Sequence, residues 1–212
     1  MIVESRRHPT ARVCGDPVQS KVESITIKCF VCNPYMQNTY VVHLPEQKEC
    51  LIIDAGMYEP DEQQAVESYI REQQLRVAAI LITHAHPDHV CGKQWLKQTF
   101  ADAQIVDCAY LQNASGEHEP VLHYAGLDIR CLFTPGHKED CVCYYLPDND
   151  ILFSGDTLFR QSVGRTDLPG GDYDTLIESL HYLMQLPEET KVYPGHSEPT
   201  TIGYERKYNP FL

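Results

Sequence analysis

The segment THAHPDH (residues 83–89) places four side chains that can bind a metal ion within six residues. Imidazole nitrogens and carboxylate oxygens are the ligands that a divalent ion such as Zn²⁺ prefers. With this spacing, His84 and His86 can converge on one ion while Asp88 and His89 turn toward a neighbouring ion. A solvated polar loop is the alternative, but ten histidines in 212 residues rarely supply three within six. The segment therefore predicts a metal site.

Three more candidate ligands each follow a strand-like segment and a glycine: His137 after TPG, Asp156 after SG, and His196 after YPG. Glycine lets the backbone turn sharply where a side chain must point into a shared cleft. A single Gly-His or Gly-Asp pair is typical of an ordinary turn. Four motifs at strand ends share one structural explanation, so we expect all these side chains to gather around the same ions.

Alternating strands and helices are predicted to position these motifs. Residues 77–83 (VAAILIT) form a short apolar run, which is typical of a central strand buried on both faces. Residues 61–75 and 174–186 each carry one apolar stripe at helical spacing, so they should lie as helices on a sheet. Another helix is expected near residues 92–100. Strands are expected at residues 24–31, 39–43, 50–54, 104–108, 127–133, 142–146, 151–154 and 191–193.

Taken in this order, and with IDAG (residues 53–56) before them, the motifs resemble the metallo-β-lactamase superfamily from about residue 24 to the C-terminus. The resemblance implies an α/β fold, a four-layer αββα sandwich. It also implies two divalent metal ions, with zinc as the first choice and iron or manganese as alternatives. The implied ligands are His84, His86 and His137 for the first ion and Asp88, His89 and His196 for the second, with Asp156 bridging the two and Asp54 steadying the histidine loop from behind.

Two further segments are similar to compact glyoxalase II-like hydrolases, which act on thioesters such as S-lactoylglutathione. These are SVGRTDLPGGD (residues 162–172) and the C-terminal segment of residues 194–211. Larger glyoxalase II enzymes add a helical C-terminal region that grips glutathione, whereas this chain ends soon after His196. The KEDC sequence after His137 also lacks the serine that often follows this motif in the family. The resemblance implies a thioesterase of the glyoxalase II type.

The implied reaction needs no protein nucleophile. Two cations close together lower the pKa of a bridging water enough to supply hydroxide near neutral pH, and they polarise the carbonyl. Asp88 is the catalytic candidate, because it could orient the hydroxide as well as bind metal. Arg165 and Arg206, the latter beside Lys207, could receive an anionic part of the substrate, since they flank ligand motifs in an acidic protein. Ordinary surface charge is the alternative for these cations.

Three other functions compete with the thioesterase. Persulfide dioxygenases resemble glyoxalase II, share the GRTD of residues 164–167, and use one iron held by the equivalents of His84, His137 and Asp156. The LPGGD of residues 168–172 favours the hydrolase. A β-lactamase is less favoured, because the bridging aspartate is not how those enzymes complete their second site. A non-catalytic binding protein would be expected to have lost ligands, and all seven are intact.

Composition limits the location and the partners. The net charge of −13 repels nucleic acid, and no apolar run approaches the length of a membrane span. Nine cysteines are an odd number, which suits a reducing cytoplasm, and nothing in the first residues resembles a secretory signal. We expect an N-terminal extension at residues 1–22 and one hydrolase domain at residues 23–212, with a small-molecule thioester as its partner. The sequence leaves the oligomeric state open.

Overall fold

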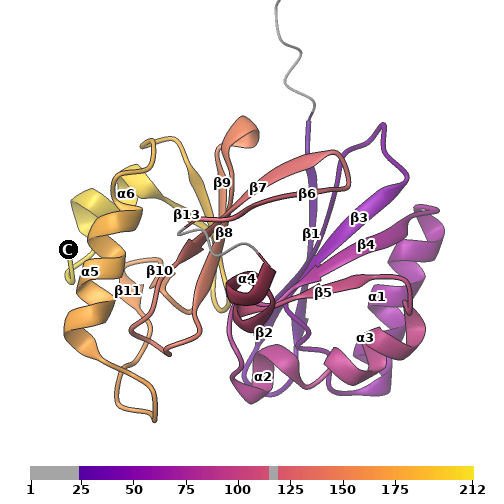
Figure 1. Cartoon of the computed structure of the whole chain (residues 1–212), viewed down its shortest axis with the longest axis horizontal. Helices are drawn as coiled ribbons and strands as arrows, with labels where there is room; N and C mark the ends of the chain where they lie inside the picture. The colour runs from indigo at the N-terminus through magenta and orange to yellow at the C-terminus, as the bar shows by residue number, and fades with distance from the viewer. Residues whose placement is uncertain (1–23, 115–118) are drawn as a thin grey trace, which may run out of the picture.

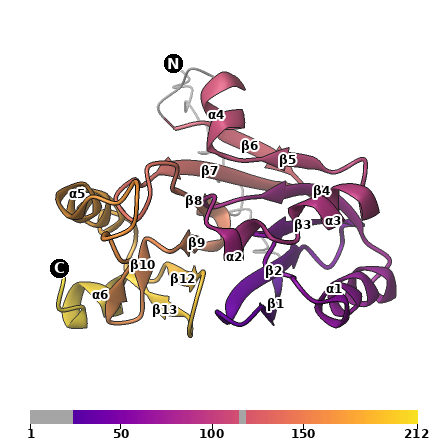
Figure 2. The same ribbon diagram turned by 90° about the horizontal axis from the view of Figure 1, so that it is seen from below.

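The computed structural model describes residues 24–114 and 119–212, so the predicted extension of residues 1–22 lies outside the described residues. Two sheets pack face to face, and helices cover the outer face of each (Figure 1; the same fold from below in Figure 2). The first sheet has the strand order β1-β2-β3-β4-β5. Its strands are β1 (Thr26–Cys32), β2 (Gln37–His43), β3 (Glu49–Ile53), β4 (Arg76–Leu81) and β5 (Gln104–Val106). Helices α1 (Pro60–Glu72) and α3 (Lys93–Thr99) cover it.

The second sheet has the strand order β13-β12-β9-β8-β7-β6. It contains β6 (Val121–Tyr124), β7 (Leu127–Phe133), β8 (Val142–Leu146), β9 (Ile151–Gly155), β12 (Lys191–Pro194) and β13 (Thr200–Thr201). Helices α5 (Tyr173–Leu183) and α6 (Ile202–Tyr208) cover it, and a small hairpin, β10 (Leu158–Phe159) and β11 (Ser162–Val163), lies beside it. The remaining elements are the short helices α2 (Pro87–Val90) and α4 (Cys108–Ala114) and a 3-10 turn at Pro147–Asn149.

Three separate apolar clusters hold the layers together. Between the sheets, residues such as Leu51 and Phe153 pack in the largest cluster. Val66 of α1 packs on the outer face of the first sheet, and Leu180 of α5 packs on the outer face of the second. Burial of apolar surface in all three clusters provides the main stabilising free energy of the fold. Three clusters separate four layers, so the predicted αββα sandwich is confirmed.

Central strand β4 illustrates how the pattern of residues dictates position. Its segment RVAAIL is buried except at Arg76, because it lies between the parallel strands β3 and β5. Strands β9 and β12 are also parallel to each other. The carboxyl ends of parallel strands meet at one edge of a sheet, which is where ligands generally bind in α/β folds. The histidine motif follows β4 at this edge.

All predicted strands and helices are found, with boundaries that differ by at most three residues, and the strands at residues 127–133 and 142–146 match the prediction at both ends. The helix expected at residues 61–75 ends at Glu72, because Gln74 has a positive φ of 55° that interrupts helical geometry. The histidine loop is not wholly irregular, since Pro87 begins the one-turn helix α2 that carries Asp88 and His89. Short elements were not predicted from the sequence: β6, β10, β11, β13, α4 and α6.

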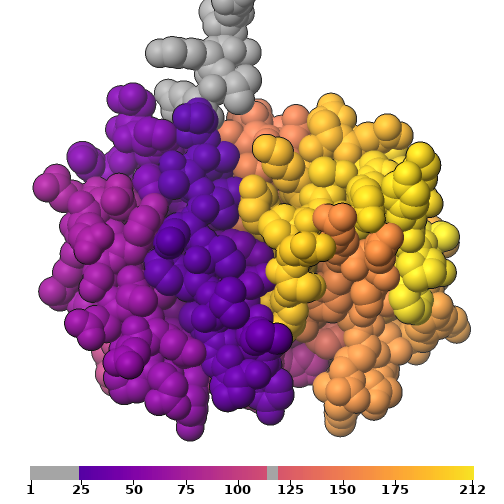
Figure 3. All heavy atoms as spheres, turned by 180° about the vertical axis from the view of Figure 1, so that it is seen from behind, coloured from indigo at the N-terminus to yellow at the C-terminus, as the bar shows by residue number. Residues whose placement is uncertain are grey.

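The last residues of the chain lie on the outer side of the second half of the molecule, away from the indigo strands of the first sheet (bright yellow in Figure 3). Glu205 of α6 is fully buried within this half and accepts three hydrogen bonds. Its donors are the backbone N–H of Gln161 at 2.8 Å, the Asn209 amide at 2.9 Å and the Thr200 hydroxyl at 2.5 Å. Because Gln161 lies in the turn between β10 and β11, Glu205 fixes this hairpin to the C-terminal segment.

None of the helices in the described residues combines the length and the apolar character that crossing a bilayer requires.

We predict that Glu205→Ala will lower the free energy of unfolding by about 2–4 kcal/mol, because each buried donor left without its acceptor costs about 1–3 kcal/mol, partly relieved by relaxation. Urea denaturation followed by circular dichroism measures this change. Glu205→Gln, which keeps one acceptor oxygen, should lower the free energy of unfolding by a smaller amount. A Glu205→Ala protein as stable as the parent would show that the carboxylate does not hold the hairpin.

Candidate metal centre

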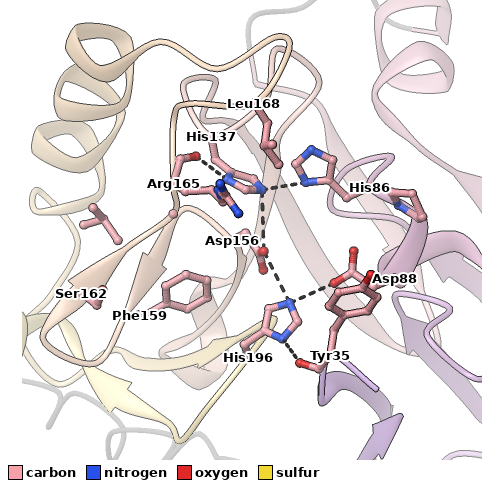
Figure 4. A pocket seen from close by; sticks show the side chains of 13 residues that line it. Tyr35, His86, Asp88, His137, Asp156, Phe159, Ser162, Arg165, Leu168 and His196 are labelled. Carbon is pink, nitrogen blue, oxygen red and sulfur yellow. Dashed lines mark hydrogen bonds and ion pairs between the residues drawn. The ribbon is translucent and has the colours of Figure 1, made fainter. Parts of the chain in front are cut away.

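A cavity of about 630 Å³ opens at the sheet edge where the ligand motifs end (Figure 4). Tyr35 of the β1–β2 turn lies on one side, and the β10–β11 hairpin and the loop after it lie on the other. The described residues lining it are Tyr35, His86, Pro87, Asp88, His137, Asp156, Phe159, Ser162, Val163, Gly164, Arg165, Leu168 and His196. Five of the seven predicted metal ligands are therefore among the lining residues, and His84 and His89 lie buried behind them.

His84, His86 and His137 form the first group of ligand atoms that lie close enough to share an ion. His86 Nδ1 is 3.0 Å from His84 Nε2 and 2.8 Å from His137 Nε2. His137 reaches this group from the loop after β7, and the other two come from the loop after β4. The structure thus brings together the three residues that the resemblance implies for the first ion.

Asp88, His89 and His196 form the second such group. His196 Nε2 is 3.1 Å from Asp88 Oδ2 and 3.4 Å from His89 Nε2. Burial lowers the pKa of His196, but the hydrogen bond to Asp88 and the negative charges of Asp156 and Asp88 together outweigh burial and raise the pKa above the ordinary value. Burial raises the pKa of Asp88, but the same hydrogen bond and the nearby His89 and His196 together outweigh burial and lower the pKa.

Asp156 lies between the two groups. Its Oδ2 is 3.6 Å from His137 Nε2 in the first group and 3.5 Å from His196 Nε2 in the second. Its Oδ1 is 3.3 Å from His89 Nε2, yet finds no hydrogen-bond partner in the described part of the chain. A buried carboxylate oxygen without a donor is costly unless a cation satisfies it. This position matches the bridging place that the resemblance implies.

Three of the histidines are oriented by hydrogen bonds from their outer nitrogens, meaning the Nδ1 atoms that face away from the ligand groups. His137 Nδ1–H donates to the Arg165 carbonyl at 2.7 Å, and His196 Nδ1–H donates to the Tyr35 carbonyl at 3.0 Å. His89 Nδ1–H donates to Asp54 at 2.8 Å. When the outer nitrogen carries the proton of a neutral imidazole, the inner Nε2 presents its lone pair.

Lone pairs directed at one another across about 3 Å repel, so this arrangement needs cations or protons among the inner nitrogens. Nitrogen and carboxylate donors in two adjoining groups have the chemistry that divalent transition-metal ions require. The acceptors behind the histidines provide the outer support that such ligands normally have. The residues therefore fit divalent metal ions.

Asp54 supports the histidine loop through hydrogen bonds, although it does not line the cavity. Its Oδ1 accepts a hydrogen bond from the backbone N–H of Thr83 at 2.7 Å, and its Oδ2 accepts one from His89. The Thr83 hydroxyl donates to the same carboxylate at 2.8 Å. Asp54 adopts a left-handed backbone conformation with φ of 60°, which turns its side chain beneath the histidine loop. Sequence reasoning did not single out Thr83.

Burial and charge act against each other at the buried ligands. Burial lowers the pKa of His84 well below its ordinary value, and the neighbouring imidazoles lower it further. Burial also opposes protonation of His89, but the carboxylates of Asp54 and Asp156 outweigh it and raise the pKa well above the ordinary value. For Asp156, burial raises the pKa, and the adjacent His89 outweighs it and lowers the pKa. A proton on His89 therefore competes with a cation for the same place.

Close packing explains two of the glycines that precede ligands. A Cβ at Gly195 would lie 2.3 Å from Asp156 Oδ1, and a Cβ at Gly155 would lie 2.7 Å from the Thr83 hydroxyl. Gly155 also has a positive φ of 50°. Any side chain at either position would displace a ligand or its support, so these glycines do more than allow a turn.

The two predicted substrate-binding arginines lie in different places. Arg165 lines the cavity, but its guanidinium donates two hydrogen bonds of 2.7 Å to Asp167. Arg206 does not line the cavity. Its guanidinium donates to the carbonyls of Met184 and Leu186, beyond the end of α5, because these carbonyls have no partner within the helix. The structure therefore does not bring Arg206 to the ligand groups.

Curated relatives cover most of the chain. A probable metallo-hydrolase, YqgX, of Bacillus subtilis is 36% identical over 203 residues, which is 84% of this chain and 93% of the relative. The hydroxyacylglutathione hydrolase GloC of Haemophilus influenzae is 30% identical over 218 residues, which is 89% of this chain and 98% of the relative.

Solved structures share the fold of this chain. BLEG-1, titled a B3 metallo-beta-lactamase, is 34% identical with a TM-score of 0.77, covering 88% of this chain and 99% of that chain. ETHE1 of Myxococcus xanthus is 27% identical with a TM-score of 0.77 over 87% and 83% of the two chains. TTHA1623 in a di-iron-bound form is 35% identical with a TM-score of 0.71 over 87% and 100% of the two chains.

The family model described as "Metallo-beta-lactamase superfamily" matches residues 32–120 and 126–196. Its match covers well over half of the chain, which therefore belongs to the metallo-beta-lactamase superfamily.

Proposed function

We propose that this protein is a dinuclear metal-dependent hydrolase that cleaves thioesters in the manner of glyoxalase II, with zinc as its first-choice metal. The observation that carries the proposal is the position of Asp156, whose carboxylate faces both ligand groups at 3.3–3.6 Å. The GloC relative, named a hydroxyacylglutathione hydrolase, supports the thioester as the substrate class. The YqgX relative supports the broader assignment as a metallo-hydrolase.

Two divalent cations bound in these groups would lower the pKa of a water between them and polarise the substrate carbonyl. The chain itself positions the reactants. Asp88 lines the cavity, and His196 holds its Oδ2, so the other carboxylate oxygen could accept a hydrogen bond from the attacking water. A thiolate is a good leaving group and needs little help from an acid. This is why a thioester suits the site better than an amide.

An iron-dependent persulfide dioxygenase is the second candidate. The ETHE1 structure supports this alternative through its likeness to the chain. The first ligand group together with Asp156 would be sufficient for one ion. BLEG-1 makes β-lactam cleavage a third candidate. All three reactions use the same edge of the sandwich, so substrate assays and metal content must separate them.

The expected location is the cytoplasm. All eight cysteines in the described residues are unpaired, which is compatible with a reducing compartment.

Purified protein should contain two metal ions per chain and should hydrolyse S-lactoylglutathione. Elemental analysis combined with detection of released thiol measures both. Oxygen consumption with glutathione persulfide, together with one iron per chain, would overturn the hydrolase in favour of the dioxygenase. Rapid nitrocefin turnover without thioester cleavage would favour the β-lactamase.

Asp156→Ala should remove at least one metal ion and lower kcat by at least a thousandfold, because no other described carboxylate faces both ligand groups. Elemental analysis and steady-state kinetics test this together. Asp148→Asn, an exposed carboxylate in the 3-10 turn, serves as the control and should change neither quantity. Retention of both ions by Asp156→Ala would refute the bridging role.

Asp54→Asn should weaken binding of the second metal ion about 10- to 100-fold, because an NH₂ group in the place of Oδ2 would face His89 Nδ1 and favour the wrong tautomer. Competition with a metal chelator measures the affinity. Thr83→Val removes a hydroxyl donor to the same carboxylate and should weaken binding less. An unchanged affinity in Asp54→Asn would show that orientation of His89 does not depend on this carboxylate.

A further inference from the structure

We propose that the preferred substrates are thioesters with an uncharged, apolar acyl chain, which is bound by a wall formed by Phe159, Val163 and Leu168. This inference rests on the proposed thioesterase function and names the substrate class of the same site. The reasons are the apolar lining beside the ligands, the neutralised charge of the lining arginine, and the rigid anchoring of the wall.

The apolar wall lies directly beside the metal ligands. Phe159 and Val163 come from the β10–β11 hairpin, and Leu168 comes from the loop that follows it. Figure 4 shows Phe159 on the His196 side of the cavity and Leu168 on the His137 side. The Phe159 ring centroid is 6.2 Å from that of His196, so an acyl chain attached to a carbonyl at the ions would meet this wall. Leu168 leaves 37% of its surface exposed, which is apolar area that a ligand could cover.

The arginine that lines the cavity is already paired with a carboxylate before any ligand binds. Arg165 is the only lysine or arginine among the described residues that line the cavity. Its two hydrogen bonds to Asp167 lower the pKa of that carboxyl to about 2, so both partners stay charged near neutral pH. Arg160, beside the wall, pairs with Glu198 at 3.2 Å and stacks on Tyr204. An anionic acyl group would therefore have to compete with a carboxylate for its cation.

The wall is held in place from behind. Glu205 accepts the backbone N–H of Gln161 at 2.8 Å, and the Asn209 amide donates to the Ser162 carbonyl at 3.1 Å. Both bonds fix the hairpin that carries Phe159 and Val163. A preformed apolar surface does not itself have to be ordered when an apolar chain binds. Selectivity should therefore follow the apolar area that the chain buries.

The test uses acyl thioesters of one neutral thiol, N-acetylcysteamine. Within the series acetyl, butyryl and hexanoyl, kcat/KM should rise roughly twofold to fourfold for each methylene. Adipoyl has the length of hexanoyl but ends in a carboxylate, and its kcat/KM should be at least tenfold lower. A flat series, or adipoyl equal to or better than hexanoyl, would overturn the inference while leaving the thioesterase intact. If no thioester reacts with metal-loaded protein, both the proposed function and this inference fail.

Variants assign the selectivity to the named residues. Phe159→Ala and Leu168→Ala should each reduce the hexanoyl-to-acetyl ratio of kcat/KM at least threefold, and exposed Val121→Ala should leave it unchanged. Asp167→Asn frees Arg165 and should raise the adipoyl-to-hexanoyl ratio at least fivefold, whereas Asp174→Asn, an equal loss of charge on α5, should not. Unchanged ratios in Phe159→Ala, Leu168→Ala and Asp167→Asn would refute the assignment.

Binding provides a readout that does not depend on turnover or on correct folding of a variant. S-hexyl-N-acetylcysteamine, a thioether that cannot be hydrolysed, should bind the parent protein at least tenfold more tightly than its 5-carboxypentyl counterpart in isothermal titration calorimetry. The reverse order of affinities would overturn the inference.

Discussion

Five imidazoles and two carboxylates are held at one edge of the sandwich with their ligand atoms within 4.8 Å of one another in each group. Without cations, inner nitrogens such as those of His86 and His137, 2.8 Å apart, would repel unless a proton lies between them. The rest of the fold supports this arrangement. Apolar burial in three clusters provides the free energy that stabilises the fold, and hydrogen bonds donated by the outer nitrogens orient the imidazoles. The site therefore depends on packing for its stability and on the hydrogen-bond acceptors behind the histidines for its geometry.

The grouping of the candidate ligands could be predicted from sequence because each candidate follows a local rule. After Arg76, β4 is an uninterrupted apolar run, and the motif after it must appear at the strand's carboxyl end. Glycines before His196 and Asp156 marked the sharp turns, although sequence could not show that a Cβ at Gly195 would meet Asp156. Local patterns thus identified the candidate ligands that the fold brings together, and the tertiary contacts explained the glycines.

Features that depend on long-range contacts could not be predicted in the same way. Glu205 occurs in a charged helical segment, and only the fold shows that its carboxylate is buried beneath the β10–β11 hairpin. Arg206, its neighbour in sequence, was expected at the substrate but instead satisfies carbonyls beyond α5. Charge alone cannot distinguish these two roles, because a charged residue's partner is set by strands and helices far away in the chain. Short strands such as β10 and β11 also lack enough residues to show a period.

The superfamily match restricts the reaction class less than it restricts the fold, because one ligand set can serve hydrolysis or oxygenation. The ions determine which bonds can be activated, whereas the walls determine which molecule reaches them. In this chain the wall and the ligands belong to the same piece of structure: the β10–β11 hairpin follows Asp156 directly, and the Arg165 carbonyl holds His137. A substitution in the substrate wall can therefore disturb a ligand's orientation. Selectivity must accordingly be judged from ratios between substrates, which cancel a common effect on the ions, and not from the activity toward any one of them.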